Sequence, residues 1–212
     1  MNREELVNNI KDGEIISKCD FSGMDLSGAE LCGGIFEEVI FRKANLAGAD
    51  LRESIFTKPD FSGADLSGVN MHSTVMIEAN LTGVSLKNAD MVEAKLTNSD
   101  VSGTDLAGAD LSSAALISAT LKNTDFSDTN LDRTVLHEAK LQGANLSGAN
   151  LAQTIMMGAA LEGAVFTGAK LYLTMMLYVN LSGMDLGGMT FSGVLFKGAD
   201  LSGVNCTAAD LT

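Results

Sequence analysis

The residue types that could carry out chemistry are few in this chain and do not cluster in its sequence. The 212 residues include two histidines, His72 and His137, and three cysteines, Cys19, Cys32 and Cys206. Paired histidines, or a cysteine beside a histidine, could bind zinc or form a nucleophile and base, but only if they converge in space. Aspartate recurs in Asp-Leu-Ser-Gly fragments, yet the Gly-Gly-x-Gly-x-Asp nonapeptide of calcium-binding β-rolls is absent. What these residues can do therefore depends on the elements that position them.

An apolar residue stands at every fifth position, from Ile16 and Phe21 to Leu201, Cys206 and Leu211, without a break in register. A period of five matches neither the 3.6 of a helix nor the 2 of a strand, so it predicts a repeat architecture. The residue two before each apolar centre is small, and the centre is often preceded by Asp or Asn and followed by Ser or Thr and Gly, as at residues 64–68. Because Gly, Asn, Asp and Ser favour tight turns, we expect a turn every five residues.

These residues resemble the pentapeptide-repeat family, whose consensus is a small residue, Asp or Asn, Leu or Phe, and two variable positions. The resemblance runs from Ile15 to Thr212. It implies an all-β fold, a right-handed quadrilateral β-helix with four pentapeptides in each coil. At about 4.8 Å per coil, about ten coils would form a rod roughly 48 Å long. Residues 1–14 are expected to form a short capping helix, with Asn2 and Glu5 in a capping box, and residues 15–212 a single solenoid.

A regular rod of this kind predicts convex ridges and no cleft. His72 and His137 would lie on different faces several coils apart, so neither a metal pair nor a catalytic pair is expected. Cys19 and Cys206 would lie buried at opposite ends, and Cys32 would be an exposed thiol. We therefore expect no enzyme, no catalytic residue, no cofactor and no metal.

One of the four faces expected at a period of twenty carries apolar residues outward. They precede the buried centres, and only Lys95 interrupts them: Ile35, Ile55, Val75, Ala115, Val135, Ile155, Met175 and Leu195. Stacked β-branched residues could stabilise the sheet as a ladder, and a contiguous apolar stripe could equally bind a partner. Toward the C-terminus the stripe gains the aromatic residues and methionines typical of interfaces. The candidate partner-binding or dimer residues are Ile155, Met157, Tyr172, Leu173, Met175, Leu177, Tyr178 and Leu195.

Acidic residues follow two other faces in broken rows. The candidates for an acidic surface are Asp25, Asp50, Asp65, Asp90, Asp105, Asp110 and Asp125. Some pentapeptide-repeat proteins mimic duplex DNA with such rows and bind type II topoisomerases, so the resemblance implies gyrase binding and quinolone resistance as an alternative function. A duplex of roughly 48 Å presents roughly 28 phosphate charges. These two faces offer ten carboxylates, with a neutral stretch from Asn130 to Lys170.

The net charge of −13 is carried almost entirely by residues 1–138, which hold 23 acidic and 11 basic side chains against 4 and 3 in residues 139–212. An acidic surface disfavours direct binding to nucleic acid or to anionic membranes. The sequence contains no apolar run of about 18 residues and no signal peptide. We expect a cytoplasmic protein, or one secreted without a signal peptide by a dedicated bacterial system.

The most consistent function is a non-enzymatic interaction scaffold, a rigid rod that binds a protein partner of unknown identity. The opening helix and residues Phe21–Leu26 are similar to pentapeptide proteins linked to bacterial type VI secretion, which implies an adaptor or effector-associated role. The repeat runs to Thr212 without a cap. A homodimer through the C-terminal coils, as in related proteins, is one explanation, and a longer parent protein is the other.

Overall fold

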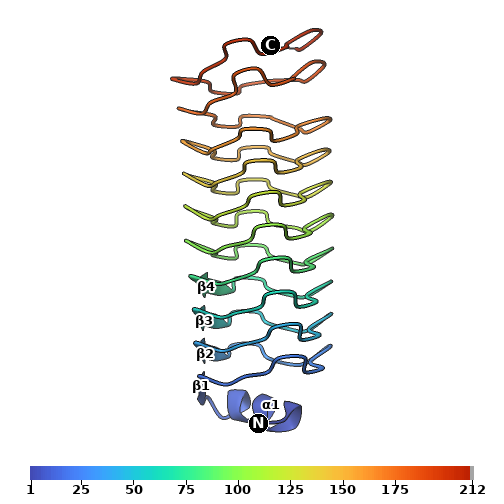
Figure 1. Cartoon of the computed structure of the whole chain (residues 1–212), viewed down its shortest axis with the longest axis vertical. Coiled ribbons are helices and arrows are strands. Elements are labelled where there is room, and N and C mark those ends of the chain that lie inside the picture. The colour runs from blue at the N-terminus through green and yellow to red at the C-terminus, as the bar shows by residue number, and fades with distance from the viewer. Residues whose placement is uncertain (211–212) are drawn as a thin grey trace.

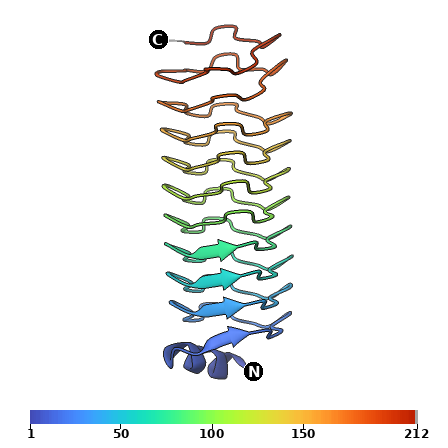
Figure 2. The same cartoon turned by 90° about the vertical axis from the view of Figure 1, so that its left-hand side faces the viewer.

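The chain folds as a rod of stacked coils, with the two termini at opposite ends (Figure 1). The computed structural model describes residues 1–210. Four short strands lie one above another on a single face (Figure 2): β1 (Ile15–Ser17), β2 (Ile35–Glu37), β3 (Ile55–Thr57) and β4 (Val75–Ile77). They form one parallel sheet in the order β1-β2-β3-β4. The right-handed quadrilateral β-helix expected from the sequence is confirmed.

Pairing between residues twenty apart defines the coil. In the sheet, Ile15 pairs with Ile35 and Ile35 with Ile55, and isolated parallel bridges continue this register on the other faces. The hydrogen bonds alternate in direction: the amide of Leu146 donates to the carbonyl of Val165 at 2.7 Å, and the amide of Val165 donates to the carbonyl of Ala144 at 2.9 Å. Each coil is therefore held by backbone bonds to both of its neighbours.

The apolar centres fill the axis of the rod. They are fully or almost fully buried from Ile16 to Phe191. In the first coils the core is aromatic, because the rings of Phe36 and Phe56 stack at 4.4 Å and those of Phe41 and Phe61 at 4.8 Å. The expectation that Cys19 and Cys206 are buried is wrong: Cys19 is half-buried, and Cys206 occupies a centre position but is exposed, because within residues 1–210 its coil is covered on one side only.

Buried hydroxyl groups add a second ladder inside the rod. The inward small position beneath the apolar stripe holds Ser54, Thr74, Thr134, Thr154 and Thr174, all fully buried. Each hydroxyl donates to a carbonyl twenty-three residues earlier, at 2.7–2.8 Å. A buried hydroxyl without a partner would cost free energy, so this bond explains why serine and threonine are tolerated in the core.

The helix α1 (Arg3–Lys11) covers the first coil. Asn2 caps it: its side chain accepts from the amide of Glu5, and the Glu5 carboxylate accepts from the amide of Asn2, so the expected capping box is present. Leu6 and Ile10 are buried against the first coil. Apolar helical residues therefore close the N-terminal end of the core, where a bare coil would expose it.

Candidate functional site

Every coil turns at four corners, and each corner residue has a positive φ. Glycine occupies half of these positions in the described chain, and polar or charged residues occupy nearly all the others. Only Leu173, with φ 54°, and Tyr178, with φ 57°, are large and apolar or aromatic at such a corner within residues 1–210. A bulky residue in the left-handed region is strained, by of order 1–2 kcal/mol. Strain at two corners of one coil identifies this coil as a candidate site.

These two corners lie beside the apolar stripe, in a part of the rod where several large apolar and aromatic side chains are exposed. Tyr172 is 54% exposed, Leu173 43%, Tyr178 59% and Leu195 50%. Leu173 lies over Gly193, and the ring of Tyr178 lies over Gly198, so close that a Cβ on either glycine would collide with it. We name Tyr172, Leu173, Met175, Tyr178 and Leu195 the apolar corner patch. The side chains of Leu173 and Tyr178 therefore each reach from their own coil to the next one.

The other candidate residues of the stripe are less accessible. Ile155, Met157, Met175 and Leu177 are only partly exposed. Near the N-terminus the stripe consists of residues in register along the parallel sheet, Ile15, Ile35, Ile55 and Val75. A stabilising ladder accounts for that part of the stripe, whereas it does not account for the strained, exposed corners at Leu173 and Tyr178.

The seven candidate acidic residues have a shared role within the turns. In each case a carboxylate oxygen accepts from the backbone amide two residues later, as Asp65 does from Ser67 at 3.0 Å, and the same holds for Asp25, Asp50, Asp90, Asp105, Asp110 and Asp125. Bonds from the hydroxyl and amide of Ser67 hold the pKa of Asp65 below its ordinary value. Three of the seven are also bonded to asparagines one coil away. Their spacing therefore follows from turn formation.

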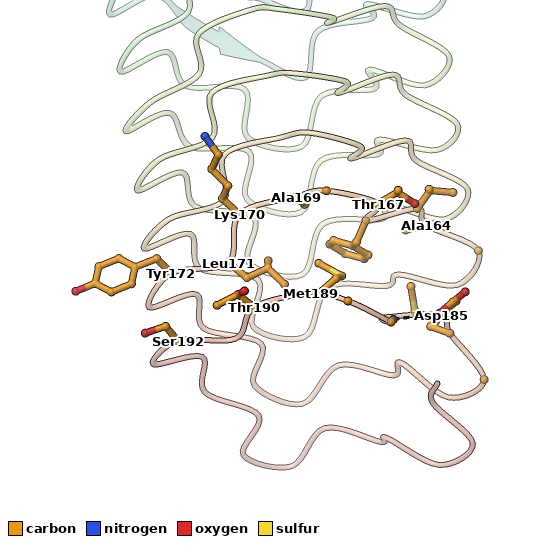
Figure 3. Close-up of a pocket in the computed structure, with 18 of the residues that line it drawn as sticks. Ala164, Thr167, Ala169, Lys170, Leu171, Tyr172, Asp185, Met189, Thr190 and Ser192 are labelled. Carbon is orange, nitrogen blue, oxygen red and sulfur yellow. Dashed lines mark hydrogen bonds between the residues drawn. The ribbon is translucent and has the colours of Figure 1, made fainter. Parts of the chain in front are cut away.

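The structure contains a cleft, so the expectation of an uninterrupted rod without one is wrong. A pocket of about 880 Å³ lies between two successive coils, lined by residues 163–172 on one side and by residues between Ser182 and Ser192 on the other (Figure 3). Phe166 and Met189 line it from opposite coils. We name the opening between residues 161–172 and 180–190 the inter-coil gap.

The gap exists because the backbone ladder is interrupted at one junction. Within residues 1–210, eight amides make no bond from coil to coil although their counterparts one coil earlier do: Leu161, Gly163, Phe166, Gly168, Leu171, Asn180, Asp185 and Thr190. Bridges at Asn145–Val165 and at Asp185–Asn205 show that the junctions on both sides are intact. The coil beyond the gap is therefore a paired, ordered part of the rod.

On the fourth face, which we call the hinge, backbone hydrogen bonds still join the two coils on either side of the gap. The amide of Leu173 donates to the carbonyl of Ser192 at 2.9 Å, and the amide of Met176 donates to the carbonyl of Leu195 at 2.8 Å. The amide of Tyr178 donates to Lys197 at 3.1 Å. The apolar corner patch thus lies on the only face that joins the two coils, within the described residues. The sequence predicted the patch but not the gap. Val165 is unusual here, at a position mostly occupied by Asp or Asn, but this residue alone does not indicate a gap.

Side chains that could bind a metal ion do not gather in the described part of the chain. No three His, Cys, Asp or Glu side chains among residues 1–210 lie close enough to hold a metal ion. His137 contacts the carbonyl of Met157 at 3.0 Å through Nδ1. The described residues also contain no helix long and apolar enough to cross a membrane.

Comparisons with known proteins agree with this geometry. The sequence matches the family described as Pentapeptide repeats in segments that extend from residue 19 to residue 212, leaving out residues 177–179. No curated protein matches the sequence. The fold is similar to the crystal structure of HetL, a pentapeptide repeat protein involved in heterocyst differentiation regulation from the cyanobacterium Nostoc sp. strain PCC 7120, with a TM-score of 0.88 and 26% identity over 99% of this chain and 96% of that one.

A second similar structure is that of QnrB1, a plasmid-mediated fluoroquinolone resistance protein. Its TM-score is 0.61 and its identity 18%, over 93% of this chain and 91% of that one. At 18% identity, the similarity to QnrB1 shows that the two proteins share a fold and shows nothing more.

Proposed function

This chain belongs to the pentapeptide-repeat family, and we propose that it is a non-enzymatic scaffold that binds a protein partner through the apolar corner patch. The observation that carries the proposal is the placement of Leu173 and Tyr178 at strained, left-handed corners where they are exposed. Asparagine occupies such corners elsewhere in the same rod, at Asn88 and Asn98. Large apolar residues that reduce stability and face solvent are expected where they serve an interaction.

The charge distribution supports the choice of this surface. Residues 139–212 are nearly neutral, with 4 acidic and 3 basic side chains, so an uncharged, apolar partner surface meets little electrostatic opposition there. Tyrosine, methionine and leucine are typical of the desolvated centre of an interface. The coils at the C-terminal end, where Leu201 is 44% exposed, would serve the homodimer that we include in the proposal.

The test replaces the patch with residues that the repeat already uses. In the triple variant Tyr172→Ser, Leu173→Asn and Tyr178→Asn, each new residue occurs at the same kind of position elsewhere in the rod, so the fold is expected to persist. We expect capture of a specific host protein, identified by mass spectrometry and then purified, to weaken by at least ~100-fold. The same variant should be compared with the wild type by light scattering to detect a dimer.

The matched control changes corners outside the patch. Gln153→Asn and Glu138→Asn lie at the same two corners of earlier coils, and capture by this double variant should equal that of the wild type. Equal capture by the patch variant and the wild type would contradict the proposal. If the captured protein is a component of a secretion apparatus, the adaptor role is supported.

A second candidate is a gyrase-binding protein, favoured by the carboxylate rows repeated at twenty-residue intervals and by the likeness in fold to QnrB1. It predicts that the purified protein binds DNA gyrase and protects it from quinolone-induced cleavage. Replacement of Asp90, Asp105 and Asp125 by asparagine, which preserves the turn bonds, should abolish that protection. Absence of gyrase binding would remove this candidate.

A further inference from the structure

We infer that the inter-coil gap is a binding site for an extended peptide segment, which enters as an additional strand between the coils. Tyr172 lines the opening and also belongs to the proposed partner patch, but the inference does not rest on the patch, because it concerns the interior of the opening and the backbone that lines it. It is carried by the eight amides that lack coil-to-coil partners, together with a pocket of about 880 Å³ between them.

The two sides of the gap have the geometry of strand edges. Val165 remains paired to Asn145 on one side of the gap, and Asp185 remains paired to Asn205 on the other. Both edges are thus held in the conformation that accepts another strand, without a neighbour on the side of the gap. Unpaired edges of this kind bind extended chains by main-chain hydrogen bonds.

The direction of the free groups indicates where a peptide would pair. On the first edge, the amides of Phe166 and Gly168 lack the acceptors that the amides of Leu146 and Gly148 have one coil earlier. On the second edge, the amide of Asp185 lacks the carbonyl of Ala164, to which the regular register would connect it. These residues belong to the face opposite the hinge, where the separation is expected to be widest. Insertion of one strand requires two strand spacings, about 9.6 Å in all.

The lining indicates the chemistry of the inserted segment. It includes Gly163, Gly168, Gly183, Gly187 and Gly188, which leave the backbone accessible at close range. Phe166, Leu171, Met184 and Met189 supply an apolar floor, and Lys170 and Asp185 are its only charged residues among those described. An uncharged segment of small and apolar residues fits this lining. Its volume lies in the range of pockets that bind ligands.

Other classes of ligand fit the inter-coil gap less well than an extended peptide. A small apolar molecule would leave the amides unpaired, at a cost for each desolvated group. A helix has no free main-chain groups to offer, since its own bonds use them. An extended peptide is the ligand that satisfies both edges.

The experiment uses hydrogen exchange on the unmodified protein. In the free protein we expect the eight amides to exchange at least ~100-fold faster than the matched set one coil earlier, Leu141, Gly143, Leu146, Gly148, Leu151, Ala160, Val165 and Lys170. Equal protection of the two sets would show that the gap is closed in solution and would overturn the inference.

The probe is a capped peptide with the sequence of residues 144–150, Ala-Asn-Leu-Ser-Gly-Ala-Asn, which already pairs with the other side of the Val165 edge in the fold. Because the protein contains no tryptophan, a fluorescent label on the peptide gives an unobstructed binding signal. We expect saturable binding with a dissociation constant below ~1 mM, and at least ~10-fold slower exchange confined to the amides of the gap.

The control ligand is the same peptide with N-methylated amides, which cannot donate to the carbonyls without coil-to-coil partners in the gap, such as that of Asp185, and whose methyl groups obstruct strand pairing. It should bind at least ~10-fold more weakly. Equal binding of the two peptides, no binding up to ~1 mM, or protection of the terminal coil at residues 201–210 in place of the gap would each overturn the inference. The patch variant does not enter this experiment, so its outcome is independent of the proposed function.

Discussion

The first coils and the last coils of this rod have the same five-residue repeat, but they differ in how completely successive coils are bonded to each other. The first coils are covered by α1, filled with stacked phenylalanine rings and joined by three consecutive pairs of strands. The last coils contain one aromatic pair, Phe191 and Phe196 at 5.6 Å, and are joined across the inter-coil gap on one face only. The five-residue period therefore determines the shape of each coil, whereas the packing of side chains between coils determines how firmly one coil binds the next.

The strongest test of this comparison removes one phenylalanine ring from the continuously bonded part of the rod and one from beside the inter-coil gap. Phe126 and Phe166 occupy the same face two coils apart, and both are buried, but only Phe166 lines the gap. Phe126→Ala should lower the free energy of unfolding by about 3–5 kcal/mol, because both neighbouring coils lose contacts and a cavity forms. Phe166→Ala should cost less, since no backbone bonds join the two coils on its side of the rod and these coils can close over part of the cavity. Urea denaturation measures both, and equal costs would contradict a continuous opening beside Phe166.

A second test increases crowding in the first coils. Gly34 is the only glycine at an inward small position in the described chain, and a Cβ there would lie about 2.5 Å from the ring of Phe36. Gly34→Ala should therefore destabilise the fold by about 1–3 kcal/mol. Phe36→Leu combined with Gly34→Ala should cost less than the sum of the single changes, because the smaller side chain makes room. Additive costs would mean that the ring is not the obstacle.

A third test removes strain from the last coils. Tyr178→Gly relieves the left-handed corner but loses the contact of the ring with Gly198. We expect a net gain of up to about 1 kcal/mol in stability, together with weaker partner capture. Glu138→Gly, at the same corner two coils earlier, should give a similar or smaller gain with no effect on capture. A loss of stability in Tyr178→Gly would show that the ring contributes more to the fold than its strained backbone costs.

The sequence predicted the fold well because its signal is repeated about forty times along the chain, once in each pentapeptide. Apolar centres such as Phe41 and Leu111 lie where the period places them, buried. The gap could not be predicted, because residues 161–190 keep the same period as every other coil and pairing between coils depends on small differences in packing. For the candidate site, sequence predicted the exposure of Tyr172 and Leu173, while the left-handed corners became apparent only when φ was known.

The smallest effect that we predict is a difference between the two regions in how their contribution to stability depends on pH. Six aspartates in residues 1–138 have a lowered pKa, Asp20, Asp25, Asp50, Asp60, Asp65 and Asp110, against Asp200 alone among the described residues after 138. A carboxyl whose pKa is lower in the folded state than in the unfolded state stabilises the fold above the unfolded value of about 3.9, and this contribution is lost as the pH falls through the folded value.

The variant Asp65→Asn isolates one such contribution. Asparagine keeps the turn bond, as Asn145 does with Ser147, but it does not titrate. The stability difference between the wild type and Asp65→Asn should therefore be larger at pH 5 than at pH 2.5, measured from urea unfolding at each pH. Ser67→Ala, which removes the hydroxyl donor to Asp65 together with the 2.7 Å hydrogen bond between the Ser67 and Ser85 hydroxyls, should show part of the same trend. A stability difference that is constant with pH would mean that the charged carboxylate of Asp65 is no better stabilised in the fold than in the unfolded chain. The turn at Asp65 would then be stabilised only by hydrogen bonds that do not depend on charge.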